Sequence, residues 1–460
     1  MSTQNLHRLP LTYTVVMGMG QTGIACTRFL QHQQTPVCVM DNRENPPQLD
    51  TLKQIDAQIP HIIGRFDANI LANAQEIVIS PGLSLQEPAL QAAIQAHVPI
   101  ISEIELFARY VDAPVVAITG SNGKSTVTTL LGEMAKQAGW DVRVGGNLGI
   151  SALDLLTHQR PDVYILELSS FQLETTHSLK PKAAVVLNVS EDHMDRYNSF
   201  AEYTETKRKI YQHCEHVVVN ADDPMVVAML KPTQAHLSFS LHCGRGTFSI
   251  CPHQGEPYFA RNHETQFPTP LLPVKAAKLQ SRIMQANILA ALALGEAIDI
   301  PMSAMLDAAQ MFKGLPHRCQ WVTQHQGVDW FNDSKGTNVG ATVAAIQGLE
   351  RPGQTILIAG GEGKGADFEA LAMTAEQHLK ACVLIGRDAL LIQEALAEYA
   401  NIPTYLANSM ETAIHEAGQV AQTGDAVLLS PACASFDMFK GYEHRGQAFI
   451  HAVRQWAHHT

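Results

Sequence analysis

Long apolar runs are missing from this sequence of 460 residues. None approaches the ~20 consecutive apolar residues that a membrane-spanning helix needs. The first ten residues, MSTQNLHRLP, also lack the basic start and apolar core of a secretory signal. We therefore expect no membrane partner, and we expect a cytoplasmic protein.

Positive charge is scarce as well. Lysine and arginine number 32 against 44 aspartate and glutamate residues, so the formal net charge is −12. A nucleic acid would be repelled by such a chain unless basic residues were concentrated in a patch, and the sequence shows no such concentration. Small-molecule partners are expected instead. A prior of about 150 residues per domain suggests about three domains.

Cysteine pairs of the CxxC type are absent. Scattered cysteines in a cytosolic chain are most simply reduced thiols, which is what we expect of all of them. One local cluster, His242, Cys243, Cys251 and His253, resembles a zinc site in composition but lacks a metal-binding spacing, so structural zinc is not favoured. The cysteines are Cys26, Cys38, Cys214, Cys243, Cys251, Cys319, Cys382 and Cys433.

A phosphate-binding loop is the clearest motif present. The β-branched apolar run Val115–Thr119 predicts a buried strand, and an apolar-periodic helix begins after a glycine-rich turn. Backbone N–H groups of such a turn converge on one anion, Lys124 reaches the terminal phosphates, and Ser125 can ligate Mg²⁺. Because Ile118 stands where the usual GxxxxGK[ST] pattern begins, we interpret a shorter loop, TGSNGKS; the alternative is an ordinary glycine turn. The predicted phosphate-binding residues are Gly120, Ser121, Asn122, Gly123, Lys124, Ser125 and Thr126.

The N-terminal region predicts a strand, a glycine turn, a helix and a second strand. Residues 18–23 satisfy GxGxxG, and Asp41 closes the second strand. Taken alone, this pattern favours a dinucleotide site, although the glycines could serve only close helix–strand packing. A third strand at 76–80 ends in Pro81-Gly82, at the same edge of the predicted sheet.

The central region places further polar residues at strand ends. Glu167 ends a buried strand, where an acid suits a Mg²⁺ contact beside a phosphate loop. The next apolar strand leads to His193. Because the strand ends at Gly120, Glu167 and Asn188 should converge on one edge, we predict a metal or phosphate role for His193. Lys207 lies in a basic helix that could be merely a solvated face, and side-chain chemistry alone leaves this open.

The C-terminal region repeats the strand–helix alternation. A strand at 328–331 leads into a polar cluster at 332–338, and βα units begin at 355, 381 and 426. This pattern predicts a second doubly wound domain without a Walker loop of its own. The expected fold is therefore α/β with three domains: 1–103, 104–314 and 315–460.

A set of motifs in fixed order resembles the Mur ligase family, and within it the branch that adds D-glutamate. The motifs are TGSNGKST, LELSSFQLE, NVSEDHMDRY, GLPHR, NDSKGTN, GGEGKGADF and SPACASFDMFKGYEHRG. The resemblance implies an N-terminal Rossmann-like domain for a UDP-sugar, a central P-loop ATPase domain and a C-terminal Rossmann-like domain that closes over the amino acid. It also implies that the glycine turn at 18–23 meets uridine diphosphate and not NAD.

The activity implied by the resemblance is ATP-driven amide formation. D-Glutamate would be joined to UDP-N-acetylmuramoyl-L-alanine through an acyl phosphate and a tetrahedral intermediate, by a monomeric enzyme that uses two Mg²⁺ ions. Matching the family motifs residue by residue gives Lys124, Glu167, His193 and Lys207 as catalytic. Ser125, Glu167, His193 and a carbamate on Lys207 would be the metal ligands, because a lysine ammonium itself cannot ligate a cation.

Binding residues are implied in the same way. The positions matching nucleotide contacts are Asn287, Arg318, Asp333 and Lys335. Those matching UDP-sugar contacts are Thr22, Asp41, Asn42, Arg43, Ser80, Gly82 and Asn147. Those matching D-glutamate contacts are Thr337, Lys364, Ser435, Phe436 and Tyr442. The chain departs from the family pattern at Ile283-Met284, where His-Asn is usual, and at Gly336, where Ala is usual.

Other functions remain open at this point. A sibling ligase that adds L-alanine or diaminopimelate, or a folylpolyglutamate synthase, would share most of these motifs; the segment SPACASFDMF favours D-glutamate. A dinucleotide-dependent oxidoreductase would leave the phosphate loop unexplained. A non-catalytic nucleotide-binding regulator would leave the acid and the histidine at neighbouring strand ends without a role.

Overall fold

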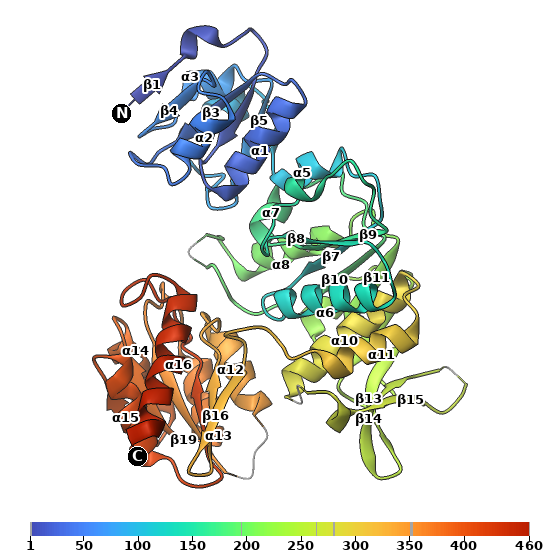
Figure 1. The fold of residues 1–460 in the computed structure, drawn as a ribbon, viewed down its shortest axis with the longest axis vertical. Helices are drawn as coiled ribbons and strands as arrows, with labels where there is room; N and C mark the ends of the chain where they lie inside the picture. The colour runs from blue at the N-terminus through green and yellow to red at the C-terminus, as the bar shows by residue number, and fades with distance from the viewer. Residues whose placement is uncertain (1, 195, 264, 279–280, 350–352, 460) are drawn as a thin grey trace.

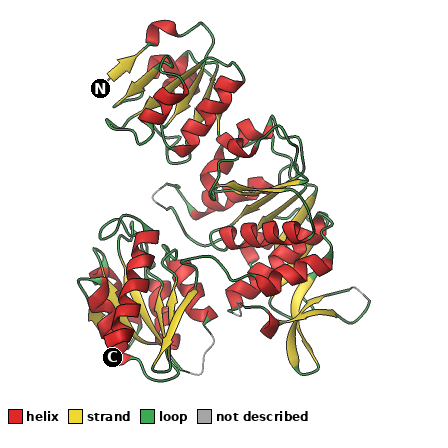
Figure 2. Ribbon diagram, viewed as in Figure 1, coloured by secondary structure: helices red, strands yellow, loops and turns green. Residues whose placement is uncertain are grey.

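The computed structural model describes residues 2–194, 196–263, 265–278, 281–349 and 353–459 and contains three sheets in succession along the chain (Figure 1). Helices pack against each sheet, as Figure 2 shows, so the predicted α/β class is confirmed. Among the described helices, none combines the length and apolar character that a membrane span requires.

The N-terminal sheet has six strands in the order β1-β4-β3-β2-β5-β6. All pairings are parallel except that of β1 with β4, as expected for a doubly wound domain. Its strands are β1 (Ser2–Gln4), β2 (Thr14–Met17), β3 (Val37–Asp41), β4 (His61–Ile63), β5 (Glu76–Ile79) and β6 (Ile100–Ile101). Its helices are η1 (Leu6–Arg8), α1 (Gln21–His32), α2 (Leu49–Ile55), α3 (Ala68–Ala72), α4 (Leu90–Gln95) and α5 (Glu103–Ala108).

The central sheet has nine strands in the order β15-β14-β13-β12-β11-β10-β7-β9-β8. From β8 to β13 neighbours are parallel, whereas β13, β14 and β15 form an antiparallel extension that projects from the domain in Figure 1. The strands are β7 (Val115–Thr119), β8 (Val142–Gly146), β9 (Val163–Glu167), β10 (Ala183–Val186), β11 (His216–Asn220), β12 (His236–Ser240), β13 (Phe248–His253), β14 (Glu256–Arg261) and β15 (Thr269–Pro273). The helices are α6 (Lys124–Gln137), η2 (Leu153–Leu155), α7 (Ser170–Glu174), α8 (Phe200–Arg208), η3 (Lys209–Tyr211), α9 (Pro224–Val227), η4 (Val274–Ala276), α10 (Arg282–Ala297) and α11 (Met302–Met311).

The C-terminal sheet has six strands in the order β16-β17-β21-β18-β19-β20. Only β16 is antiparallel to its neighbour, so the carboxyl ends of β17, β18 and β21 share one edge. The strands are β16 (Gln320–His325), β17 (Val328–Asn332), β18 (Thr355–Gly360), β19 (Leu379–Ile385), β20 (Thr404–Leu406) and β21 (Ala426–Leu429). The helices are α12 (Val339–Gly348), α13 (Glu369–His378), α14 (Ala389–Tyr399), α15 (Met410–Val420) and α16 (Tyr442–His459).

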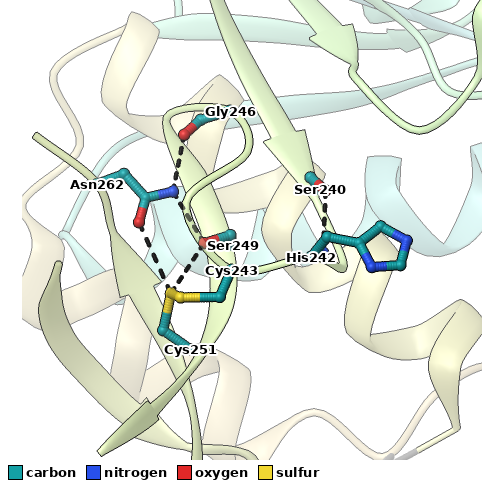
Figure 3. The surroundings of a disulfide bond; sticks show 7 residues. All are labelled: Ser240, His242, Cys243, Gly246, Ser249, Cys251 and Asn262. Carbon is teal, nitrogen blue, oxygen red and sulfur yellow. Dashed lines mark hydrogen bonds between the residues drawn. A yellow bond between two sulfur atoms is a disulfide. The ribbon is translucent and has the colours of Figure 1, made fainter. Parts of the chain in front are cut away.

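The expectation of uniformly reduced cysteines was wrong for one pair. Cys243 and Cys251 form a disulfide with their Cα atoms 4.6 Å apart (Figure 3). The reason is topological: β12 is followed by a short turn and the parallel pairing of β13, which brings the two positions together. The two cysteine sulfurs of the His/Cys cluster at 242–253 are therefore bonded to each other and are not available as zinc ligands. The other six cysteines are free, as predicted.

Candidate active site

Three strand ends of the central sheet lie side by side. β7 is paired in parallel with β9, opposing Ile118 to Glu167, and with β10, opposing Thr119 to Val186. The residues that follow these strands therefore share one edge, as the sequence predicted. This edge carries the glycine loop, the acid and the segment that contains His193.

The glycine loop is held in a fixed shape by its neighbours. Asn122 N donates to Asn188 Oδ1 over 2.8 Å, and Asn188 Nδ2 donates back to Asn122 O over 3.0 Å. Gly123 precedes α6 with a φ of 86°, and a Cβ there would lie 2.6 Å from Asn287 Oδ1. Glycine is therefore required at position 123 both by its backbone conformation and by the close approach of Asn287.

Two lysines, Lys124 partly buried and Lys207 buried, converge on this loop. Lys124 Nζ donates to Gly120 O over 2.8 Å and to Ser121 O over 2.9 Å, while Lys207 Nζ donates to Gly120 O over 3.0 Å. Burial lowers the pKa of Lys124, and burial together with the nearby Lys124 lowers the pKa of Lys207 well below its ordinary value. Lys207 is 2% exposed, so the alternative that it belongs to a solvated face was wrong.

Glu167 faces the same loop with an uncommitted oxygen. Its Oε1 accepts a hydrogen bond from Asn147 Nδ2 over 2.8 Å, whereas its Oε2 is buried without a hydrogen-bond partner among the described residues. Ser125 Oγ accepts from Arg318 over 2.7 Å. Across the part of the chain that the structure describes, no three His, Cys, Asp or Glu side chains gather closely enough to hold a metal unaided. An orphaned carboxylate oxygen beside a phosphate loop fits Mg²⁺, which typically takes one or two protein carboxylates and completes its shell with phosphates and water.

The segment that follows β10 touches the other two domains. Arg196 donates to Leu83 O over 2.7 Å in the N-terminal domain, and Asn338 Nδ2 of the C-terminal domain donates to Asp192 Oδ2 over 3.0 Å. His193 lies between these contacts with its ring 4.7 Å from that of Phe171. The motif residue Asp195 lies outside the described residues. This segment, 188–197, is therefore the place where the three domains meet.

A cavity of about 390 Å³ opens beside the loop, between the central and C-terminal domains. The four residues matched to nucleotide contacts all line it together with the loop. Its remaining wall is largely apolar. The lining of the cavity includes Asn122, Gly123, Thr126, Phe239, Leu241, Ile283, Met284, Asn287, Arg318, Asp333 and Lys335.

Two titratable groups in this cavity have shifted pKa values. Asp333 accepts hydrogen bonds from Cys319 N and Ser430 Oγ, but burial raises its pKa to about 6. Burial, reinforced by Arg318, lowers the pKa of Lys335 to about 8, and its Nζ lies 3.8 Å from the centre of the Tyr442 ring. A Cβ at position 336 would lie 2.7 Å from both Asp333 Oδ2 and Ser430 Oγ, which explains a glycine there in this chain.

The residues matched to D-glutamate contacts follow neighbouring strands of the C-terminal sheet. Thr337 comes after β17, Lys364 after β18, and Ser435 and Phe436 after β21, while Tyr442 opens α16. Ser435 is buried, whereas Lys364 and Phe436 are exposed. The structure thus brings these positions to one edge of the sheet.

The residues matched to UDP-sugar contacts separate into two groups. Asp41 accepts from Met19 N over 2.7 Å and from Arg43, and these hydrogen bonds outweigh the effect of burial and hold its pKa below the ordinary value. Thr22, in the first turn of α1, and the strand-end residues Asn42, Ser80 and Gly82 belong to the same domain. Asn147 lies elsewhere, against Glu167 in the central domain.

Sequence reasoning missed two buried side chains that shape the site. The Tyr203 hydroxyl is 3.1 Å from Ser121 Oγ, and its ring lies 4.6 Å from Lys207 Nζ. The spacing of four residues between Tyr203 and Lys207 on α8 would have placed both on one helix face. Arg445, 1% exposed, donates to Ser334 O over 2.9 Å and to Cys433 O over 3.1 Å. No local sequence pattern predicts that Arg445 joins the loops that carry Ser334 and Cys433.

Comparisons with known proteins agree with this geometry. Residues 12–102 match the model described as Mur ligase MurD-like, N-terminal domain; residues 118–295 match the Mur ligase middle domain; residues 317–433 match the Mur ligase, glutamate ligase domain. A protein of Nitrosococcus oceani named UDP-N-acetylmuramoylalanine--D-glutamate ligase is 50% identical over 443 residues, which are 96% of each chain. One of the same name from Pseudomonas syringae pv. syringae is 48% identical over 96% of this chain and 97% of its own.

Solved structures share the fold at low sequence identity. A pseudomurein peptide ligase type C from Methanothermus fervidus superimposes with a TM-score of 0.61 at 19% identity, covering 96% of this chain and 100% of its own. MurF ligase from Thermotoga maritima, solved in complex with ADP, has a TM-score of 0.60 at 16% identity and covers 92% of this chain and 95% of its own. With family models matched in all three domains and a half-identical relative along almost its whole length, the chain belongs to the Mur ligase family.

Proposed function

We propose that this chain is the ATP-dependent ligase that joins D-glutamate to UDP-N-acetylmuramoyl-L-alanine, in peptidoglycan precursor synthesis. The relatives of about 50% identity bear the name of that activity. The observation that supports it most is the meeting of three strand-end edges at segment 188–197, because the reaction needs three substrates at one point. The proposed domain boundaries are 1–103, 104–314 and 315–460, the first of which falls within α5.

ATP would occupy the cavity beside the glycine loop. Lys124 and the backbone N–H groups of the loop would stabilise the transferring phosphoryl group, and Arg318 would neutralise a phosphate. Asp333 would accept from ribose hydroxyls, with Asn287 and Lys335 in the same cavity. A carboxylate is a poor electrophile, so the alanyl carboxylate would attack the γ-phosphorus to give an acyl phosphate. The main task of these side chains is to position the reactants and screen their charge.

Magnesium would be held by Ser125 and Glu167, whose Oε2 is the uncommitted buried oxygen. Bound there, Mg²⁺ would supply charge stabilisation on the phosphates. His193 and a carbamate on Lys207 would hold a second ion. The burial of Lys207 supports this modification, since the lowered pKa favours the neutral amine that can add CO₂ and release a proton.

D-Glutamate would bind at the C-terminal edge formed by Thr337, Lys364, Ser435, Phe436 and Tyr442. A cation and hydroxyl groups suit a dicarboxylate. Its amine would then attack the acyl phosphate and expel inorganic phosphate through a tetrahedral intermediate. The UDP-sugar would lie along Thr22, Asp41, Asn42, Arg43, Ser80, Gly82 and Asn147. We further propose a cytoplasmic monomer.

The proposal is tested by an ADP-release assay with UDP-N-acetylmuramoyl-L-alanine and ATP. D-Glutamate, L-glutamate, L-lysine and diaminopimelate are offered one at a time. We expect ADP only with D-glutamate. Release with diaminopimelate or L-lysine would point to a sibling specificity, and equal release with every amino acid, or with none, would end the proposal.

A further inference from the structure

The disulfide lies next to the wall of the nucleotide cavity. Phe239, in β12, and Leu241, just after it, both line that cavity. Cys243 follows two residues later, in the turn to β13, and Cys251 lies within β13 (Figure 3). A change at the disulfide therefore acts on a chain segment that is continuous with the cavity wall.

The partly buried Asp222 holds the start of this turn. Asp222 accepts from Leu241 N over 2.7 Å and from Ser240 Oγ over 2.6 Å, and Ser240 Oγ in turn accepts from His242 N over 2.9 Å. The far side is tied by Asn262, whose Nδ2 donates to Gly246 O over 2.8 Å. The disulfide fastens the stretch between these two anchors.

The two cysteine residues differ in exposure. Cys243 is exposed, whereas Cys251 is 4% exposed. A small thiolate can therefore reach Cys243 Sγ, and Cys251 is the leaving group. Since Asn262 Nδ2 donates to Ser249 Oγ, the Ser249 hydroxyl hydrogen can point at Cys251 Sγ, 3.4 Å away, and stabilise the departing thiolate. Once protonated, the thiol can donate to Asn262 Oδ1, which lies 3.8 Å from the sulfur. The surroundings thus accommodate both oxidation states.

We propose that Cys243 and Cys251 form a thiol–disulfide modification site that adjusts nucleotide affinity in response to low-molecular-weight thiols. One thiolate breaks the S–S bond, forming a mixed disulfide at Cys243 and a thiolate at Cys251. A second thiol then displaces the first as a symmetrical disulfide and leaves Cys243 reduced. Two thiols are oxidised, and the protein gains two electrons and two protons. Disulfides of proteins in reducing compartments are typically transient and of this kind.

Closing the bond restricts residues 243–251 and, through Leu241, favours one arrangement of the cavity wall. The oxidised form should therefore bind ADP more tightly, by about fivefold or more, a typical coupling between neighbouring sites. This inference rests on the proposed nucleotide site but not on the identity of the amino acid substrate.

The test uses the full-length protein purified without reductant and divided into untreated and glutathione-reduced samples. Alkylation followed by peptide mass analysis reports the state of each cysteine, and calorimetry gives the Kd of ADP. We expect Cys243 and Cys251 to resist alkylation until reduction, and reduction to raise the Kd at least about fivefold.

Two variants show whether the response depends on the disulfide. Cys243→Ser, at an exposed position, should show one Kd in both samples, whereas Cys214→Ser, far along the chain, should keep the response. Alkylation of both residues without reductant, an unchanged Kd on reduction, or a response retained in Cys243→Ser would each overturn the inference. D-Glutamate-dependent ADP release measured on the same samples tests the proposed function separately.

Discussion

Single charged residues in the nucleotide cavity set its pH response. Burial and Arg318 hold the pKa of Lys335 at about 8, so the free enzyme loses this cation as the pH rises through that value. Because kcat/KM reports ionisations of the free enzyme, kcat/KM for ATP should fall above about pH 8. Lys335→Arg should keep the charge and remove that alkaline limb. A wild-type profile that stays flat to high pH would count against a role for this charge.

Asp333 is a residue where stability and function oppose each other. Its pKa is about 6 in the folded chain, above the ~3.9 of an unfolded aspartate, so the folded state binds the extra proton. Stability from this group is fully present below ~3.9 and is lost as the pH rises through about 6. At pH 7.5, Asp333→Asn should therefore raise the free energy of unfolding by up to about 3 kcal/mol, and with it Tm, while weakening ATP use. Thermal melts at pH 7.5 and 4.5 check this, because the gain should shrink at the lower pH; a variant with a lower Tm at both would refute it.

Lys124 and Glu167 could be predicted from local sequence. Lys124 follows a predicted strand and its glycine turn, and Glu167 ends a predicted strand. Arg318 and Asp333 needed the family resemblance, since the contact of Arg318 with Ser125 spans two domains. Arg445 escaped prediction for a physical reason: its partners, Ser334 and Cys433, lie on two loops that only the folded sheet brings together.

Among the elements, the loop between β7 and α6 depends most on one residue. Gly123→Ala would introduce a Cβ 2.6 Å from Asn287 Oδ1 and place alanine at a φ of 86°. We expect ADP affinity to fall by more than about tenfold, because the loop must move away from Asn287 in addition to bearing a backbone strain of order 1–3 kcal/mol. Calorimetry measures this, with Gly139→Ala as a control, where φ is also positive but the Cβ meets no neighbour within 4 Å. Equal losses in the two variants would assign the effect to backbone strain alone.

Element existence was predictable where the apolar pattern was clear, as for β7 and β17. The order of the strands β12 to β15 could not be predicted in the same way. The parallel pairing of β12 with β13 depends on tertiary packing, and the disulfide that it permits could not be foreseen from a spacing without a CxxC pair.

For the whole molecule, the proposed reaction requires the C-terminal domain to close on segment 188–197. One link between the two domains is the hydrogen bond from Asn338 to Asp192, which lies beside His193. Asn338→Ala should raise the KM for ATP about fivefold, which corresponds to the loss of one hydrogen bond of about 1 kcal/mol. It should also lower Tm slightly, because the Asn338 side chain caps α12 by accepting from Ala341 N. Lys136→Ala, which removes an exposed pair with Glu133 on α6, is the matched control and should leave KM unchanged. Equal KM values for wild type and Asn338→Ala would show that this contact does not matter for closure.

The proposed reaction is tested most directly by tracing the carboxylate oxygen of the substrate into inorganic phosphate. UDP-N-acetylmuramoyl-L-alanine labelled with ¹⁸O in both oxygens of its alanyl carboxylate is incubated with ATP and each amino acid, and the inorganic phosphate is analysed by mass. If the carboxylate attacks the γ-phosphorus and D-glutamate displaces phosphate, one ¹⁸O should enter phosphate for each ADP released, with D-glutamate and with no other amino acid. Unlabelled phosphate, or labelled phosphate whatever amino acid is offered, would contradict the account.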